Sequence, residues 1–216
     1  MFQDRFEAAR QLSDRLGKYK NHRNSVVLAI PRGGVQLGFV LSQSLGLPLD
    51  VILIKKIGHP LNPEFAIGSV SLSRVSVTEE ALKQYEIPRA FVAAEIRRLR
   101  EELKKRYELY RGGEKPIPLR DKIVIVTDDG VATGNTLFAA VDAVRREHPK
   151  SVVVAIPVAP KHALKLLEQK ADEVVCLEAP EEFSAVGQFY NHFDPVQDQE
   201  AIRLLKEANL SLKSEA

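Results

Sequence analysis

One stretch, residues 123–136, constrains the fold of this chain more than any other. It opens with four β-branched residues, Ile-Val-Ile-Val, which are typical of a strand buried on both faces. Asp128 and Asp129 follow, and a turn of small and hydroxyl-bearing residues leads into an apolar run at 137–141 that predicts a helix. Ligands of open parallel sheets bind in the crevice beyond the carboxyl ends of the strands. We therefore expect both carboxylates to face such a crevice, beside backbone N–H groups that favour an anion.

The residue types in this stretch predict the chemistry of the ligand. Adjacent carboxylates accept hydrogen bonds from a diol such as ribose O2 and O3. Gly130, Thr133 and Gly134 let the backbone approach an oxyanion closely, and Thr133, Asn135 and Thr136 add side-chain donors. Together these groups fit a ribose 5-phosphate. A plain strand–turn–helix junction is the alternative, and a Mg²⁺-dependent phosphohydrolase is another, although the latter does not explain the Thr-Gly-x-Thr run.

A second glycine turn, Pro31-Arg32-Gly33-Gly34-Val35, lies between a predicted strand at 25–30 and a predicted helix at 35–45. It would place backbone N–H groups and a guanidinium at the start of a helix. Two such turns in one domain suit two separated phosphate groups. Taken alone, a Gly-Gly turn is equally compatible with a tight connection.

Residues 49–54 predict another buried strand, and Lys55 and Lys56 follow it. Two ammonium groups at the carboxyl end of a strand would stabilise negative charge on a bound polyanion. The alternative is a solvated turn with ordinary surface lysines. His59, in the breaker-rich loop 58–63, is a candidate acid–base, although a lone loop histidine is more often simply exposed.

The rest of the chain predicts alternating strands and helices. A long helix at 89–110 carries basic residues interleaved with glutamates, which favours a solvated helix over a nucleic-acid-binding face. This alternation predicts an α/β fold, a doubly wound and mostly parallel sheet with helices on both faces, plus a small hood or lid region. The remaining strands are expected at 65–70, 74–77, 151–156 and 172–177, and the remaining helices at 2–20, from 78–80, 137–148, 160–170 and 197–208.

Composition sets the broad class of the protein. The 216 residues, 44% of them hydrophobic, are enough for one sizeable domain. The 31 basic and 29 acidic residues give a net charge of +2, so we expect neither nucleic acid nor a membrane as partner. The single cysteine, Cys176, excludes an internal disulfide framework and is consistent with a reducing compartment. With no apolar run long enough to span a membrane and no signal-peptide pattern, we expect a cytoplasmic protein.

Residues 126–136, Val-Thr-Asp-Asp-Gly-Val-Ala-Thr-Gly-Asn-Thr, resemble the fingerprint that type I phosphoribosyltransferases use to bind 5-phosphoribosyl 1-diphosphate (PRPP). Residues 31–34 resemble the diphosphate loop of that family, and the likeness in pattern extends over about 25–160. It implies that Asp128 and Asp129 hold the ribose hydroxyls. It further implies a 5-phosphate site at Gly130, Val131, Ala132, Thr133, Gly134, Asn135 and Thr136, and a diphosphate site at Arg32, Gly33 and Gly34. In the family this second loop often carries a non-proline cis peptide, which we expect at Arg32–Gly33.

The resemblance also divides the single domain, 1–216, into parts. The segment at about 58–115 would be an inserted lid with a long helix, and the segment at about 178–216 a C-terminal hood with a closing helix. Family members often stack an aromatic ring of the hood on the nucleobase, and Phe183 or Phe189 would do so here. The competing interpretation is that both phenylalanines close the core.

The activity implied by the resemblance is transfer of the 5-phosphoribosyl group from PRPP to a nitrogenous base, with release of diphosphate, as in nucleotide salvage. The catalytic residues would be Asp128, Asp129, Arg32, Lys55 and Lys56. Mg²⁺ would be the cofactor, held mainly by PRPP, with Asp128 and Asp129 as further candidate ligands. We also expect a homodimer.

One departure bears on the acceptor base. The 6-oxopurine transferases place a third carboxylate before Thr-Gly, whereas Ala132 stands here, as in adenine and uracil transferases. A carboxylate that takes a proton from the incoming base is therefore missing from this loop, which disfavours a 6-oxopurine. The alternative function is a PRPP-sensing regulatory or accessory protein without turnover. Arg32, Lys55 and Lys56, which a sensor can lose, are all present and favour an enzyme.

Overall fold

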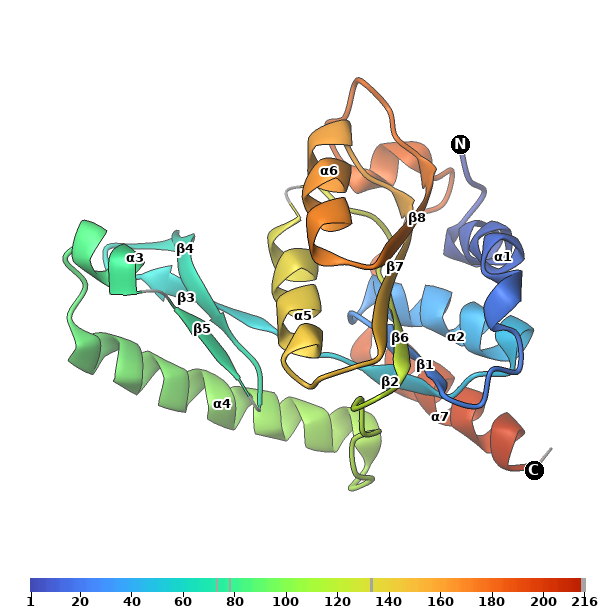
Figure 1. Ribbon diagram of the computed structural model, residues 1–216, viewed down its shortest axis with the longest axis horizontal. Helices are drawn as coiled ribbons and strands as arrows, with labels where there is room; N and C mark the ends of the chain where they lie inside the picture. Colours follow the sequence, from blue (N-terminus) through green and yellow to red (C-terminus); the bar gives the residue numbers. More distant parts are fainter. Residues whose placement is uncertain (73, 78, 133, 215–216) are drawn as a thin grey trace. The chain divides into compact units, whose positions relative to one another are not determined.

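The computed structural model describes residues 1–72, 74–77, 79–132 and 134–214 (Figure 1). The chain forms two compact units. The first comprises Met1–Ile52 and Lys115–Ala216, and the second comprises Leu53–Glu114. Within the described residues, no helix has the length and apolar character needed to cross a membrane.

The first unit is built on a five-stranded sheet with the order β2-β1-β6-β7-β8. All neighbouring strands in it are parallel, which confirms the predicted fold class. Its strands are β1 (Ser25–Ala29), β2 (Leu49–Val51), β6 (Ile123–Thr127), β7 (Ser151–Val158) and β8 (Glu173–Glu178). β1 is buried along its whole length and β6 is buried from its second residue, as their β-branched composition predicts.

Helices cover both faces of this sheet (Figure 1). One face carries α1 (Arg5–Arg15), α2 (Gly33–Leu45) and α7 (Asp198–Ser214), and the other carries α5 (Asn135–Arg145) and α6 (Lys161–Lys170). The chain passes from β1 to β2 in one direction and from β6 through β7 to β8 in the other. The order of the strands therefore reverses between β1 and β6, which is where ligands of doubly wound sheets bind.

Local sequence signals account for the ends of several helices. The Asp4 side chain caps α1 by accepting a hydrogen bond from the backbone N–H of Glu7 at 2.8 Å. α2 ends at Gly46, which has the left-handed φ of 63° that a helix C-terminus favours in glycine. The predicted helix at 2–20 is shorter than expected, because a 3-10 turn, η1 (Gly17–Tyr19), follows α1.

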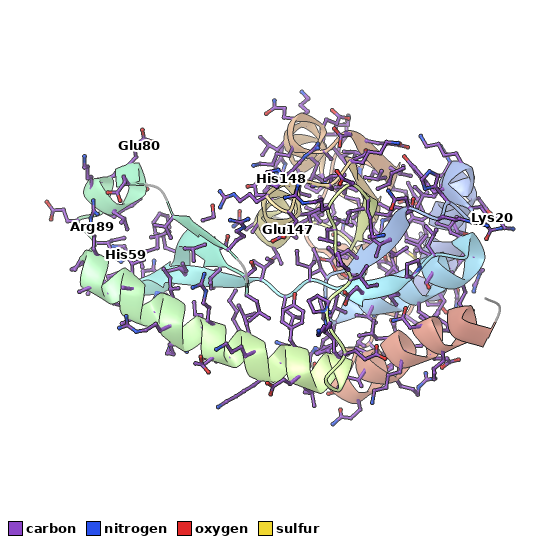
Figure 2. The ribbon with its side chains drawn as sticks, turned by 60° about the horizontal axis from the view of Figure 1, so that its bottom comes forward. Lys20, His59, Glu80, Arg89, Glu147 and His148 are labelled. Carbon is purple, nitrogen blue, oxygen red and sulfur yellow. The ribbon has the colours of Figure 1, made fainter. Side chains whose placement is uncertain are left out.

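The second unit contains an antiparallel sheet in the order β3-β4-β5, together with two helices. Its elements are β3 (Lys55–His59), β4 (Asn62–Val70), β5 (Val75–Val77), α3 (Glu79–Gln84) and α4 (Arg89–Arg111). Ile57, Val70, Leu99 and Leu103 lie in the core of this unit. Figure 2 shows His59, Glu80 and Arg89 at the same end of it.

Two local predictions for this part of the chain are wrong. The strand predicted at 49–54 ends at Val51, and the predicted loop at 58–63 is a hairpin in which β3 runs to His59 and β4 begins at Asn62. Gly58 lies at a shift of the strand register and packs against Pro63. Glycine and proline here belong to a bulged hairpin, where both residues are tolerated, and they do not break the strands.

The charged face of α4 consists of local ion pairs. Arg98 donates from Nε to Glu95 at 2.9 Å and also pairs with Glu102, and Lys104 pairs with Glu101 at 2.9 Å. These pairs lie three or four residues apart, as expected for a solvated helix.

Candidate functional site

The two glycine turns lie side by side at the carboxyl ends of β1 and β6. The strands pair in parallel up to Ala29 and Thr127, and the N–H of Ile30 donates to the carbonyl of Thr127 at 3.0 Å. Residues 31–34 and 128–132 therefore leave the sheet at the same level, at the reversal of strand order.

The two turns can approach each other closely because Gly33 and Gly34 have no side chains. A Cβ atom at Gly33 would lie 1.9 Å from Asp129 Oδ2, and one at Gly34 would lie 2.9 Å from the carbonyl oxygen of Thr127 and 3.2 Å from Asp128 Oδ1. The Gly-Gly turn thus packs directly against the acidic pair. Glycine is required at both positions by this packing, whatever ligand the turn binds.

The first turn contains a non-proline cis peptide between Pro31 and Arg32. The prediction of such a bond in this turn is confirmed, but its place at Arg32–Gly33 is wrong by one residue. The sequence could not fix the position, because the bonds before Arg32 and before Gly33 are both ordinary secondary amides with no proline to mark the cis isomer. Arg32 is exposed and forms the N-cap of α2.

Both turns end at helix N-termini that receive no side-chain cap from the described residues. The N-caps are Arg32 for α2 and Gly134 for α5, and Gly134 has a left-handed φ of 81°. The first N–H groups of a helix lack partners within the helix and carry a partial positive charge, which favours an anion. Ala132, Asn135 and Thr136 are exposed at the second turn.

One member of the expected phosphate loop is already engaged by the protein. The N–H of Val131 donates to the carbonyl of Val158 at 3.0 Å, and the side chain of Val131 is buried. This N–H is therefore not free for a phosphate. Thr133, also expected in the loop, lies outside the described residues.

The acidic pair is held by an arginine that the sequence analysis missed. Arg5 Nε donates to Asp129 Oδ2 at 2.8 Å, and the two side chains are 7% and 17% exposed. Asp128 Oδ1 accepts from the backbone N–H of Asp129 at 2.9 Å. Because a charge left alone after loss of a buried partner costs about 3–5 kcal/mol, Asp129 depends strongly on Arg5.

Electrostatics differ between the two carboxyl groups. Burial and the neighbouring Asp129 carboxylate raise the pKa of Asp128 well above its ordinary value. Burial also raises the pKa of Asp129, and the Arg5 guanidinium opposes that rise. Arg5 thereby favours the ionised form of the carboxylate it contacts.

Residues from α1 and from the segment before α7 meet at Asp129. Arg5 Nη1 donates to the carbonyl of Asp194 at 3.0 Å, and its guanidinium lies 3.8 Å from the centroid of the Phe193 ring. The hydroxyl of Tyr190 donates to the backbone carbonyl of Asp129 at 2.6 Å, and burial raises the pKa of this tyrosine, which keeps it protonated. One signal of Arg5 was present in the sequence, since position 5 falls on the apolar stripe of α1 that contains Ala9.

The C-terminal segment lies over the turn that follows β6. A Cβ at Gly130 would come within 2.5 Å of the Val186 side chain, in the short helix η2 (Val186–Phe189). Phe183 and Phe189 are half-buried and stack on each other, with ring centroids 5.2 Å apart. Phe189 also packs against the cluster around Tyr190.

The lysines expected beside the diphosphate lie in the second unit and begin β3, so they do not end β2. Lys55 Nζ donates to Glu102 at 2.6 Å, and Lys56 is exposed. His59 Nδ1 accepts from the N–H of Leu61 at 3.1 Å, which stabilises the hairpin turn. The structure therefore groups Arg32, Gly33 and Gly34 with the acidic pair, and places Lys55, Lys56 and His59 in a different compact unit.

Comparison with known proteins decides the family. A family model for the phosphoribosyl transferase domain matches residues 3–193.

The chain belongs to the phosphoribosyl transferase domain family.

Relatives of this phosphoribosyl transferase domain support the assignment. The chain is 38% identical over 210 residues to the Mycobacterium tuberculosis protein "Putative phosphoribosyl transferase Rv0571c", and the match covers 97% of this chain and 47% of that protein. It thus spans about half the length of this relative. The crystal structure of TT1426 from Thermus thermophilus is 38% identical, covers 95% of this chain and 98% of that one, and superimposes with a TM-score of 0.84.

The packing of the two turns in this phosphoribosyl transferase domain generates a first prediction. Gly33→Ala should lower the free energy of unfolding by about 1–3 kcal/mol, because the new Cβ pushes the Asp129 carboxylate away from Arg5. Urea denaturation measures this change. The control is Gly17→Ala, where a Cβ meets nothing within 4 Å and the change should stay within about 0.5 kcal/mol. Equal stabilities of the two variants would contradict the packing argument.

The raised pKa of Asp128 generates a second prediction, for the protein without ligand. A carboxyl whose pKa is higher in the folded than in the unfolded state does not destabilise the fold below its unfolded pKa. As the pH rises above that value, the free energy of unfolding falls, because the fold disfavours the charged form. Asp128→Asn should therefore increase the free energy of unfolding at neutral pH, and the gain should disappear below about pH 4, near the unfolded pKa of aspartate. Urea titrations at several pH values test this. Asp14→Asn, at an exposed position of α1, should show no such gain.

Proposed function

We propose that this chain binds PRPP and transfers its 5-phosphoribosyl group to a nitrogenous base, with release of diphosphate. The observation that carries the proposal is the contact between the acidic pair and the Gly-Gly turn, at the reversal of strand order between β1 and β6. The acidic pair is the proposed acceptor for a diol, and the turns that precede α2 and α5, whose N-termini favour anions, lie next to it. PRPP has a matching layout, with a ribose diol between a 5-phosphate and a diphosphate.

Each part of PRPP has a proposed place in the first unit. The ribose hydroxyls would donate to Asp128 and Asp129. The 5-phosphate would accept from the turn and helix start at 130–136, apart from the N–H of Val131, which the carbonyl of Val158 already accepts. The N–H groups of Asn135 and Thr136 begin α5 there. The diphosphate would face Arg32, Gly33 and Gly34, at the N-terminus of α2.

The proposed reaction is a substitution at ribose C1. The bond from C1 to the diphosphate oxygen stretches and breaks, its electron pair leaves with the diphosphate, and positive charge develops on the ribose ring. A ring nitrogen of the base then bonds to C1 from the opposite face, and the surplus proton leaves the base. Arg32 and the N–H groups of α2 would stabilise the departing diphosphate, while the acidic pair holds the sugar in place. Catalysis is then mostly positioning and electrostatic stabilisation.

Mg²⁺ is proposed as the cofactor. Among the described residues, no group of three or more His, Cys, Asp or Glu side chains is placed to hold a metal ion. Mg²⁺ prefers oxygen ligands and keeps much of its water, so PRPP oxygens would supply most of its ligands, with Asp128 and Asp129 as the protein carboxylates available. The ion would neutralise charge on the diphosphate.

Other parts of the proposal rest on residue chemistry. Lys55 and Lys56 are proposed as further positive charge for the diphosphate, and Lys55 would have to exchange its Glu102 partner to act so. Phe183 or Phe189 is proposed to stack on the base, which would require the two rings to separate.

A homodimer and a cytoplasmic location complete the proposal, and light scattering and cell fractionation test them.

The decisive experiment is a PRPP titration by calorimetry, followed by measurement of diphosphate release with adenine, guanine, xanthine, uracil and orotate. Binding with base-dependent release supports the transferase. Binding without release from any base would favour the PRPP sensor. Absence of PRPP binding would overturn both functions.

Replacement of one carboxylate oxygen of Asp128 should lower the affinity for PRPP. Asp128→Asn should weaken PRPP binding about tenfold to 100-fold, because hydrogen bonds to charged groups contribute about 1.5–3 kcal/mol. Calorimetric titration measures the affinity, and Asp14→Asn is the matched control. The same Asp128→Asn protein is expected to be more stable, so weaker binding cannot be ascribed to unfolding. PRPP binding at wild-type strength would remove Asp128 from the site.

Removal of divalent metal should stop turnover. With EDTA present, diphosphate release should fall to background and return when Mg²⁺ is added in excess, because the departing diphosphate loses its neutralising charge. Undiminished release in EDTA would refute the role of Mg²⁺.

A further inference from the structure

We infer that Arg5 is a positioning residue for the binding of the ribose. Arg5 fixes the Asp129 side chain so that each carboxylate of the acidic pair leaves one oxygen free to accept a hydrogen bond from one sugar hydroxyl. The inference rests on the proposed function, and it concerns a residue far from the acidic pair in the sequence.

Arg5 is held in one place by three separate contacts. Its Nε donates to Asp129, its Nη1 donates to the carbonyl of Asp194, and its guanidinium lies over the Phe193 ring. The residue is 6% exposed, so the side chain cannot swing into solvent without breaking all three contacts. Arginine suits this place because its planar fork donates in two directions while its face stacks on an aromatic ring.

A count of the carboxylate oxygens shows what this contact does at the site. Asp128 Oδ1 accepts from the N–H of Asp129, and Asp129 Oδ2 accepts from Arg5. The other two oxygens, Asp128 Oδ2 and Asp129 Oδ1, accept no hydrogen bond from the described residues. A vicinal diol has two hydroxyl donors, so the acidic pair offers one acceptor to each.

Asp129 is fixed at its backbone as well as its side chain. The Tyr190 hydroxyl holds the Asp129 carbonyl, while Arg5 holds the carboxylate. Without Arg5, the carboxylate would lose the donor that selects its rotamer, and Asp129 Oδ1 would no longer be presented to the sugar. The expected consequence is a loss of affinity that is confined to sugars carrying the hydroxyl that donates to Asp129.

The test uses three probes that need no metal: ribose 5-phosphate, 2-deoxyribose 5-phosphate and 3-deoxyribose 5-phosphate. Calorimetry compares wild type, Arg5→Gln, Arg5→Lys and the control Arg10→Gln, which changes an exposed arginine of the same helix. Arg5→Gln should bind ribose 5-phosphate at least about tenfold more weakly than wild type. One of the two deoxy sugars lacks the hydroxyl that donates to Asp129. Arg5→Gln should bind that sugar with the same affinity as wild type. Arg10→Gln should match wild type with all three probes.

The deoxy sugars separate positioning from a purely structural role. A structural arginine would weaken all three probes equally, and an irrelevant one would weaken none; either result overturns the inference. If Arg5→Gln does not fold, Arg5→Lys decides, since it keeps the charge but cannot reach Asp129 and Asp194 together. It should show the same selective loss in smaller degree, and uniform or absent loss would again overturn the inference. If wild type binds no ribose 5-phosphate, the inference and the proposed function both fail, whereas uniform or absent loss in the Arg5 variants overturns the inference alone.

Discussion

The arrangement of the site depends on the parallel register of β1 with β6. Five residue pairs, from Ser25 with Ile123 to Ala29 with Thr127, bring both strands to the edge of the sheet at the same level. Side chains alternate between the faces of a strand, so a slip of one residue would turn the residues at the strand end to the opposite face. The register therefore places the Gly-Gly turn against the acidic pair, and the absent Cβ atoms of Gly33 and Gly34 permit the contact.

Two half-buried carboxyl groups at one strand end carry an electrostatic cost, and contacts from α1 and from residues 190–194 reduce it. Arg5, from the first helix, neutralises Asp129, while Tyr190, Phe193 and Asp194 fix either the arginine or the aspartate backbone. The remaining cost falls on Asp128, whose pKa is raised by burial and by its neighbour. If the acidic pair binds a sugar as proposed, this cost is stability exchanged for function, as at many functional sites.

The residue pattern of single segments predicted much of the secondary structure, because several of these patterns are typical of only one kind of element. The β-branched runs at 123–126 and 152–154 have the composition of buried parallel strands, and both lie in the sheet. The hairpin at 55–70 was read incorrectly, because Gly58, Pro60 and Pro63 break regular structure in most settings but are accommodated by a bulged turn. Lys55 and Lys56 were consequently assigned to the end of the wrong strand.

Contiguous residues were enough to predict the fold class, the acidic pair after a buried strand and the two glycine turns, since each follows from local chemistry. Which distant residues complete the candidate site depends on how the elements pack. Arg5 meets Asp129 across 124 positions, and Tyr190 meets it across 61. Arg5 was not predicted from the sequence, although it is buried in the fold. Its partner follows from how α1 and the C-terminal segment pack against the sheet, because a buried charge must find a counter-charge and only the fold specifies which one lies within reach.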